Sequence, residues 1–348
     1  MNLSELTTLR LGGPPGRMID AESETALIAA VDECDDRGEP VLLLGGGSNV
    51  VVADEGFPGT VIRVRSRGVT VDARGCDPDD LAACGGLLVS VAAGETWDDL
   101  VMRAVGEGWI GVEALSGIPG SVGATPMQNV GAYGQEVAET IWSVRTYDRE
   151  ARTIRTFANA ECGFAYRTSK FKGSDRFVVL SVTYQLLQGT LSASVRYTEL
   201  ARLLGVDIGE RAKLGDVRAA VLELRRAKGM VLDPADPDTW SAGSFFTNPV
   251  LDAEQAAALP DAAPRWPMAD GRIKTSAAWL IEHAGFGRGY PGPGGRVSLS
   301  NKHTLALTNR GDASTADLIR LAREVRDGVA RTFGVELVNE PVLVGCSL

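Results

Sequence analysis

The sequence predicts an α/β or α+β protein of more than one domain, and three bulk properties lead to this prediction. With 348 residues the chain is too long for one average domain, so we expect two or three. Hydrophobic residues make up 44% of the chain, enough for sizeable cores, while aromatic residues make up only 6%. The 41 glycines indicate many tight loops, as in a soluble enzyme.

The composition also argues against several classes of protein. No apolar run approaches the roughly 20 residues of a membrane helix, and the N-terminus lacks the features of a signal peptide. We therefore expect a cytoplasmic protein without a membrane partner. The net charge of −10 argues against a nucleic-acid partner. Scattered cysteines without a C-x-x-C pair, and only two histidines, argue against disulfides and metal sites: Cys34, Cys76, Cys84, Cys162, Cys346, His283 and His303.

Hydrophobic periodicity predicts helices mixed with strands. Helices are expected over residues 23–36, 97–105, 216–227, 276–284 and 315–333. Strands are expected over residues 41–44, 50–52, 60–64, 87–92, 141–147, 152–157, 177–187, 304–308 and 335–344. The expected helix caps are Ser23, the capping-box pairs Thr96–Asp99 and Ser314–Asp317, and Asp216. Three arginines of helix 216–227 are expected on its solvated face: Arg218, Arg225 and Arg226.

A glycine-rich loop directly follows the strand 41–44. It consists of Gly45, Gly46, Gly47, Ser48 and Asn49. Consecutive backbone N–H groups in such a loop can hold a phosphate, and two polar side chains add donors. The loop matches neither the dinucleotide fingerprint nor the P-loop. A phosphate-binding loop and an ordinary glycine-rich turn therefore explain it equally well.

A second glycine-rich segment spans residues 117–134. It has five glycines, two prolines and no charged residue, whereas surface loops are usually polar. We expect it to be buried against a flat non-protein group, with backbone amides making the polar contacts, as around an isoalloxazine ring and a pyrophosphate. The alternative is a glycine-rich packing loop. Its candidate residues are Gly117, Ile118, Pro119, Gly120, Ser121, Gly123, Ala124, Asn129, Gly131 and Tyr133.

Three further stretches carry candidate chemistry. Residues 166–172 hold three cations in a strongly negative protein, although Lys170 and Lys172 are expected to be solvated. The stretch 243–249 reads, on its own, as a strand end with two core phenylalanines beside Ser244. Glu340 stands in an otherwise apolar stretch, where an ionised carboxylate is costly.

Four motifs, in this order, resemble the UDP-N-acetylenolpyruvoylglucosamine reductase (UDP-N-acetylmuramate dehydrogenase) family: LGGGSNVVV, GIPGSVGATPMQNVGAYG, YRTSKFK and GSFFTNP. The resemblance covers nearly the whole chain. It implies an α+β protein with an FAD-binding fold of the vanillyl-alcohol-oxidase kind in two subdomains. It also implies a C-terminal α+β substrate-binding domain. The implied boundaries are 1–67, joined by the C-terminal strand 335–348, then 68–228 for the second subdomain and 229–334 for the substrate-binding domain.

The resemblance also implies the cofactors and the substrate. FAD would be bound non-covalently by the two glycine-rich segments, since neither histidine lies in them, and NADPH would be the reductant. The substrate would be UDP-N-acetylglucosamine enolpyruvate, reduced to UDP-N-acetylmuramate in peptidoglycan precursor synthesis. We expect a monomer.

Roles for individual residues follow from the same resemblance. Arg167 would hold the enolpyruvyl carboxylate, because a guanidinium is a planar fork that fits a carboxylate. Glu340 would assist it, although this chain has Asn339-Glu340-Pro341 where the family usually has Pro-Glu. Ser244 would protonate the substrate after hydride arrives from N5 of the reduced flavin. The implied substrate contacts are Tyr133, Lys228, Asn248, Tyr197 on the mobile loop of the long family form, and His303 at a position that is often Gln.

Two other functions remain open at the level of the sequence. The chain could be another flavin oxidase or dehydrogenase of the same fold. It could also be a flavin- or nucleotide-binding regulator without chemistry, and multiple turnover with NADPH and the enolpyruvyl sugar nucleotide would separate these possibilities.

Overall fold

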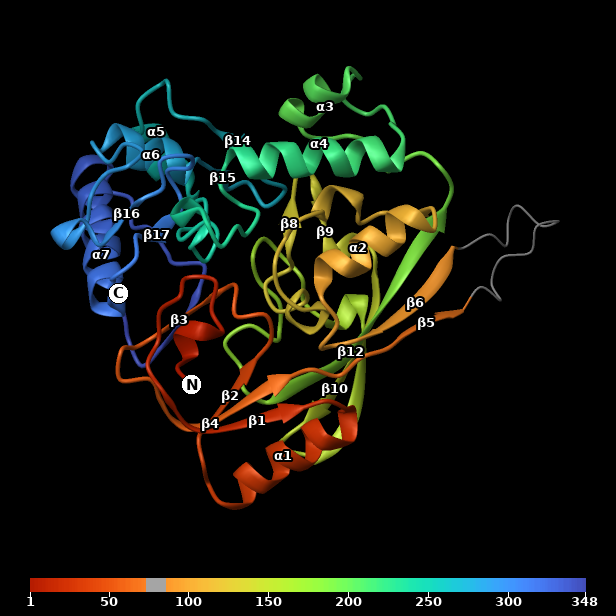
Figure 1. Cartoon of the computed structure of the whole chain (residues 1–348). Coiled ribbons are helices and arrows are strands. Elements are labelled where there is room, and N and C mark those ends of the chain that lie inside the picture. The colour runs from red at the N-terminus through yellow and green to blue at the C-terminus, as the bar shows by residue number, and fades with distance from the viewer. Residues whose placement is uncertain (73–85) are drawn as a thin grey trace. The chain divides into compact units, whose positions relative to one another are not determined.

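The computed structural model describes residues 1–72 and 86–348, so Cys76 and Cys84 lie outside the described residues. The chain divides into two compact units, each built from segments that are far apart in the sequence (Figure 1). Unit 1 comprises Met1–Gly16, Gly47–Phe57 and Ala227–Leu348. Unit 2 comprises Arg17–Gly46 and Pro58–Arg226.

Unit 2 is organised around an antiparallel sheet with the strand order β11-β10-β12-β6-β5, in which β7 pairs with the end of β12. Its strands are β5 (Val69–Asp72), β6 (Leu87–Ala92), β7 (Trp109–Ile110), β10 (Ile141–Asp148), β11 (Thr153–Ala158) and β12 (Phe177–Gln188). A three-stranded sheet has the order β1-β4-β2, formed by β1 (Pro15–Ala21), β4 (Phe57–Val64) and β2 (Val41–Leu44). Strands β2 and β4 run parallel.

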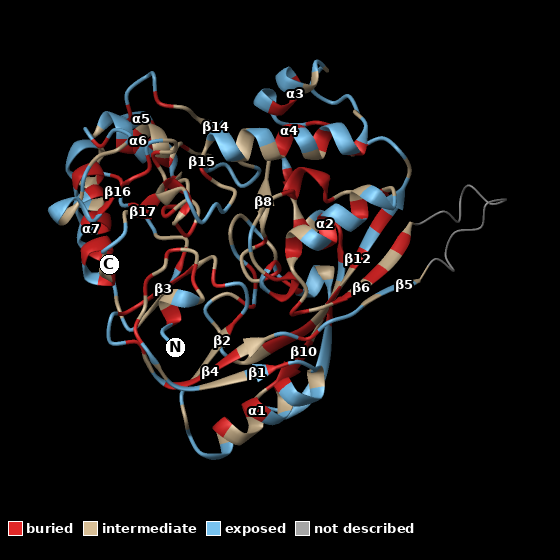
Figure 2. Cartoon of the chain, in the orientation of Figure 1, coloured by how far each residue is buried: buried red, intermediate tan, exposed pale blue. Residues whose placement is uncertain are grey.

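Four helices complete the described part of unit 2: α1 (Glu24–Asp36), α2 (Trp97–Gly106), α3 (Thr198–Leu204) and α4 (Leu214–Ala227). Trp97 of α2 is fully buried against the larger sheet, and its ring centroid lies 5.8 Å from that of Tyr184 on β12. The buried side of α1 packs against residues such as Ile62 on β4 and Leu180 on β12. In Figure 2 the helices α1 and α2 each carry both buried and exposed stretches.

Unit 1 packs around the long helix α7 (Thr315–Phe333). The helices α5 (Ala253–Ala258) and α6 (Ala277–His283) and three small sheets surround the same core. The first sheet has the order β13-β15-β14, formed by β13 (Val250–Leu251), β15 (Ile273–Lys274) and β14 (Trp266–Pro267). The second is the pair β16 (Val297–Leu299) and β17 (Leu307–Asn309). The third is the parallel pair β3 (Val50–Val52) and β18 (Val342–Val344). The apolar stripe of α7 is completely buried, at Leu318, Leu321, Val325 and Val329.

The predicted helices are all present, and the caps at Ser23 and at Ser314 with Asp317 are confirmed. Thr96 is the N-cap residue of α2 as predicted, but its side chain makes no capping hydrogen bond, so the predicted capping box is absent. The cap predicted at Asp216 is wrong, because α4 begins at Leu214 and Asp216 lies inside its first turn.

Two predicted strands are shorter or shifted. The strand expected over 304–308 is observed at Leu307–Asn309, because a turn occupies the preceding residues. The strand expected over 335–344 is reduced to Val342–Val344. Residues 338–340 instead form backbone hydrogen bonds with the segment 245–247, and this pairing is an isolated bridge that does not extend into a regular β-ladder.

Candidate functional site

The two glycine-rich segments meet within unit 2. A Cβ atom placed on Gly46 would lie 2.6 Å from Cα of Gly120, and one placed on Gly45 would overlap the hydroxyl of Ser121. Only glycine permits so close an approach of two backbones. The contact therefore brings the amides of one segment beside those of the other. Gly47, the next residue of the first loop, has a positive φ of 63°, and Ser48 and Asn49 follow it in unit 1.

The second glycine-rich segment is fixed to the stretch between β6 and α2. The N–H of Val122 donates to the carbonyl of Glu95 at 2.8 Å, and the N–H of Trp97 donates to that of Gly120 at 3.0 Å. Val122 is fully buried, whereas Pro119 and Ala124 are exposed. The segment is thus held by ordinary backbone pairing on one side and leaves part of its other side accessible.

Arg167 is held in an uncommon backbone conformation against the same segment. Its φ is 52°, and its Nη2 donates to the carbonyl of Gly131 at 2.7 Å. The amide of buried Asn129, itself at φ 47°, donates to Glu136 at 2.7 Å and to the carbonyl of Ala165 at 3.2 Å. The guanidinium therefore has a defined position.

Positive φ values at non-glycine residues are a second indication of function. Among the described residues they occur at Arg10, Asn129, Tyr133, Arg152 and Arg167. Three of these five, Asn129, Tyr133 and Arg167, are site residues predicted from the sequence. Such conformations cost about 1–3 kcal/mol each and tend to persist where a site requires them.

Tyr197 is placed against Tyr133 within unit 2. Their ring centroids are 5.3 Å apart and the rings meet edge to face. Tyr133 and Gly134, both with positive φ, form the two-residue turn between β8 (Gly131–Ala132) and β9 (Gln135–Glu136). A Cβ atom on Gly134 would lie 2.8 Å from Cβ of Arg196, so the Tyr197 segment is packed closely onto this turn.

In unit 1 the segment that contains Ser244 joins three other candidate segments. The carbonyl of Phe245 accepts from the N–H of Glu340 at 2.8 Å, and the N–H of Phe245 donates to Leu305 at 2.7 Å. Leu305 lies in the turn after His303, whose carbonyl accepts from Ala306 at 3.1 Å. Ser244 is therefore the residue next to Phe245, with which the segments of Glu340 and Leu305 both pair.

The first glycine-rich loop reaches the same place through Asn49. Its side-chain amide donates to the carbonyl of Glu340 at 3.5 Å, and its own carbonyl accepts from the N–H of Val342 at 3.0 Å. Phe245 and Phe246 are both about 1% exposed, which confirms them as core residues. Ser244 and Glu340 themselves are half-buried.

Of the remaining candidates, Asn248 and Lys228 lie in unit 1 outside this junction, whereas Lys170 and Lys172 lie in unit 2. The carbonyl oxygen of the Asn248 side chain accepts from the N–H of Ala277 at 3.0 Å and so helps to cap α6. Lys228 is half-buried and directly follows α4. Lys170 is exposed as expected, but Lys172 is half-buried and donates to the carbonyl of Arg167 at 2.9 Å.

Sequence patterns missed one polar cluster at the start of the second glycine-rich segment. Asp98 accepts from the N–H of Gly117 at 2.6 Å and from both terminal nitrogens of Arg218 at 2.7 and 2.9 Å. Arg225 lies against Gly117, so the expected solvated face of Arg218 and Arg225 is wrong and only Arg226 is exposed. The available signal was the i, i+4, i+7 spacing of Arg218, Leu222 and Arg225, which places them on one helical face.

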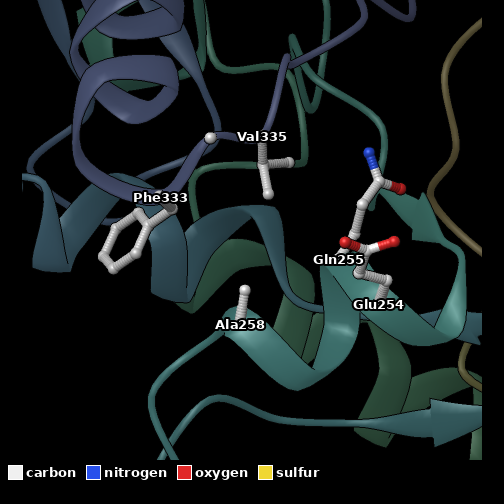
Figure 3. A pocket seen from close by; sticks show the side chains of 6 residues that line it. Glu254, Gln255, Ala258, Phe333 and Val335 are labelled. Carbon is white, nitrogen blue, oxygen red and sulfur yellow. The ribbon is translucent and has the colours of Figure 1, made fainter.

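In residues 1–72 and 86–348 no group of three or more His, Cys, Asp or Glu residues could hold a metal ion. None of the helices in that part of the chain is long and apolar enough to span a membrane. A cavity of about 240 Å³ lies between α5 and the end of α7 in unit 1, lined by Glu254, Gln255, Ala258, Phe333, Gly334 and Val335 (Figure 3). It contains none of the candidate residues.

Comparison with known proteins decides the family. Residues 234–344 match the model of the UDP-N-acetylenolpyruvoylglucosamine reductase C-terminal domain, and residues 15–156 match that of an FAD binding domain. UDP-N-acetylenolpyruvoylglucosamine reductase of Salinispora arenicola is 57% identical over 354 residues, which cover 100% of this chain and 95% of the relative. The chain belongs to the UDP-N-acetylenolpyruvoylglucosamine reductase family.

A second relative agrees with this assignment, and a solved structure agrees with the fold. The reductase of Thermobifida fusca is 57% identical over 357 residues, covering 99% of this chain and 97% of the relative. The crystal structure of the reductase from Thermus caldophilus is 23% identical, with a TM-score of 0.63 and coverage of 99% and 97%. The expected fold class is confirmed: an α+β protein with an FAD-binding fold of the vanillyl-alcohol-oxidase kind and a C-terminal α+β domain.

Proposed function

We propose that the chain reduces the enolpyruvyl group of UDP-N-acetylglucosamine enolpyruvate to UDP-N-acetylmuramate, with NADPH as reductant and non-covalent FAD. This step belongs to peptidoglycan precursor synthesis. The observation that carries the proposal is the 57% identity to reductases over essentially the whole chain. The matched FAD binding domain supports the cofactor.

The glycine-rich segments fit an FAD. The close approach of Gly46 to Gly120 leaves no room for side chains, so backbone amides, with the Ser121 hydroxyl beside Gly45, are the groups available to a ligand. Such donors suit a pyrophosphate. We propose that FAD is held by Gly45, Gly46, Gly47, Ser48, Asn49, Gly117, Ile118, Pro119, Gly120, Ser121, Gly123, Ala124, Asn129 and Gly131. When bound, FAD would supply the hydride, taken from NADPH, that is added to the vinyl carbon of the substrate.

Hydride addition moves an electron pair onto the neighbouring carbon and its carboxylate. Arg167 would stabilise this charge, and its carbonyl-anchored guanidinium is already oriented before the reaction. Glu340 would assist Arg167 at the same carboxylate. We propose that both residues are catalytic.

Ser244 would donate the proton that completes the reduction. A serine hydroxyl is a weak acid toward water, but an enediolate carbon is basic enough to accept its proton. The hydride and this proton together saturate the double bond, and the serine is then reprotonated from solvent. The pairing of Phe245 with Glu340 supports this role, because it fixes the backbone next to Ser244.

Substrate binding would involve further side chains. We propose that Tyr133, Tyr197, Lys228, Asn248 and His303 contact the sugar nucleotide, with Lys228 on its pyrophosphate. The division into residues 1–67 with 335–348, 68–228 and 229–334 also remains part of the proposal.

A spectrum and one assay test the proposed function. Purified protein mixed with FAD should retain the flavin absorption bands after gel filtration. It should then oxidise NADPH only when the enolpyruvyl sugar nucleotide is present. A protein that cannot take up FAD, or whose NADPH oxidation does not depend on this substrate, would contradict the proposal.

A further inference from the structure

One polar cluster is placed where it can control the shape of the second glycine-rich segment. Gly117 is the first residue of that segment, and its N–H donates to Asp98 at 2.6 Å. Asp98 is the second residue of α2, whose own first N–H, from Trp97, bonds to Gly120. Both ends of the turn 117–120 are therefore attached to the first turn of α2.

Helix α4 fixes the carboxylate from the other side. Arg218 forms a bidentate pair with Asp98, with its side chain 15% exposed and that of Asp98 31% exposed. Bidentate pairs between arginine and a carboxylate define orientation as well as distance. One face of α4, formed by Arg218, Leu222 and Arg225, thus meets Asp98 and Gly117 together. A Cβ atom on Gly117 would lie 2.7 Å from Leu222 and 3.4 Å from the Arg225 side chain.

The charge balance of the cluster depends on the same carboxylate. Burial would raise the pKa of Asp98, but the hydrogen bonds from Arg218 and Gly117 outweigh it and lower that pKa below its usual value. Burial lowers the pKa of Arg225, and the nearby charge of Asp98 counteracts the effect. Tyr133 also counteracts the burial of Arg225, so loss of the Asp98 charge would remove one of these two compensating interactions beside Gly117.

We propose that Asp98, held by Arg218, is a positioning residue that keeps the segment 117–134 in the conformation that binds FAD. The inference rests on the proposed function, since it assumes that this segment binds the flavin. Without the carboxylate the segment would populate other conformations, and the apparent dissociation constant rises by the reciprocal of the competent fraction.

The test compares FAD binding by the apoprotein across four proteins: wild type, Asp98→Asn, Arg218→Gln and Asp35→Asn. The last is a matched control, because Asp35 forms a similarly buried bidentate pair with Arg149 in unit 2, at 3.1 and 2.5 Å, without touching the glycine-rich segments. We expect Asp98→Asn and Arg218→Gln to raise the FAD dissociation constant about tenfold. They should also alter the visible circular dichroism of the saturated flavin. Asp35→Asn should lower only the stability toward urea.

The outcomes separate this inference from the proposed function. Wild-type protein that fails to bind FAD overturns both together. If wild type binds FAD, and Asp98→Asn and Arg218→Gln bind it equally well with the same dichroism, the positioning role alone is wrong. An equal weakening by Asp35→Asn also overturns it, because general destabilisation would then suffice. If Asp98→Asn does not fold, Arg218→Lys, which keeps the charge but lacks the planar fork, gives the same comparison.

Discussion

At the scale of single residues, the structure distinguishes candidate side chains that hydrogen bonds or buried neighbours fix in place from those that are exposed to solvent. Arg167 has a positive φ and a 2.7 Å hydrogen bond to a backbone carbonyl, while Lys170 in the same motif is exposed. Ser244 precedes two fully buried rings and a backbone pairing with Glu340. These differences lead to two predictions about individual side chains.

Replacing Ser244 by alanine should affect only one half of the reaction. Flavin reduction by NADPH should stay near the wild-type rate, whereas flavin reoxidation by the sugar nucleotide should slow by about 10²-fold or more, because general acid catalysis is lost. Anaerobic stopped-flow spectroscopy measures both rates. Thr247→Val, three residues further along, is the control and should react normally. Unchanged reoxidation in Ser244→Ala would exclude the serine as proton donor.

Replacing Arg167 by lysine should test the need for a planar fork. Lysine keeps the charge but cannot make two parallel hydrogen bonds to a carboxylate. We expect kcat/KM for the sugar nucleotide to fall by about 10- to 100-fold, the effect of losing a charge-assisted hydrogen bond. Lys170→Met removes a neighbouring exposed charge and should leave kcat/KM unchanged. Equal effects of the two substitutions would indicate a general electrostatic contribution instead.

At the scale of elements, helix ends and backbone pairings position the candidate residues. Helix α7 begins with a capping box in which Asp317 also binds Arg296 at 2.8 and 2.9 Å. The hydrogen bond from Arg296 holds the pKa of Asp317 well below its usual range. Since α7 carries most of the stripe around which unit 1 packs, its first turn contributes to the stability of that unit.

Replacing Asp317 by asparagine should therefore destabilise the protein in a pH-dependent way. We expect a loss of about 1–2 kcal/mol at pH 7, measured by urea unfolding. A carboxyl whose pKa is lower in the folded state contributes stability above its unfolded pKa of about 3.9, and loses it as the pH falls toward the folded value. The difference between wild type and variant should thus shrink below about pH 4. Asp327→Asn, an exposed position on the same helix, should show no such difference, and a pH-independent gap would contradict the assignment.

At the scale of the whole molecule, each unit is assembled from segments that are far apart in the sequence. A binding site built from such segments exists only in the folded chain, so ligand binding and folding are linked. A ligand that binds only the folded chain stabilises it by about 2.7 kcal/mol when present at one hundred times its dissociation constant. FAD should therefore raise the thermal unfolding midpoint of the apoprotein, as followed by circular dichroism. The same concentration of ATP serves as the control for a general nucleotide effect. A midpoint that does not respond to FAD would count against the cofactor.

Much of the fold could be predicted because the relevant signals are local. Periodicity located five helices but not the short α3 and α5, and Ser23 and Ser314 marked where two of the five begin. The errors arose where a distant contact outweighed a local pattern. The stretch 335–344 looks like a strand, yet residues 338–340 hydrogen-bond to the segment 245–247 and only three residues form a regular strand.

The sequence by itself determined the family, the two glycine-rich segments and the identity of the candidate residues, because these are encoded in short ordered motifs. Only the tertiary structure decided which of them meet. It joined Asn49 to Glu340 across 291 positions and Asp98 to Arg218 across 120. It also showed that Arg218 and Arg225 of α4, which were expected on a solvated face, lie at the start of the second glycine-rich segment. The physical reason is that a motif records which groups are available, whereas hydrogen bonding and burial between distant segments depend on the path of the whole chain.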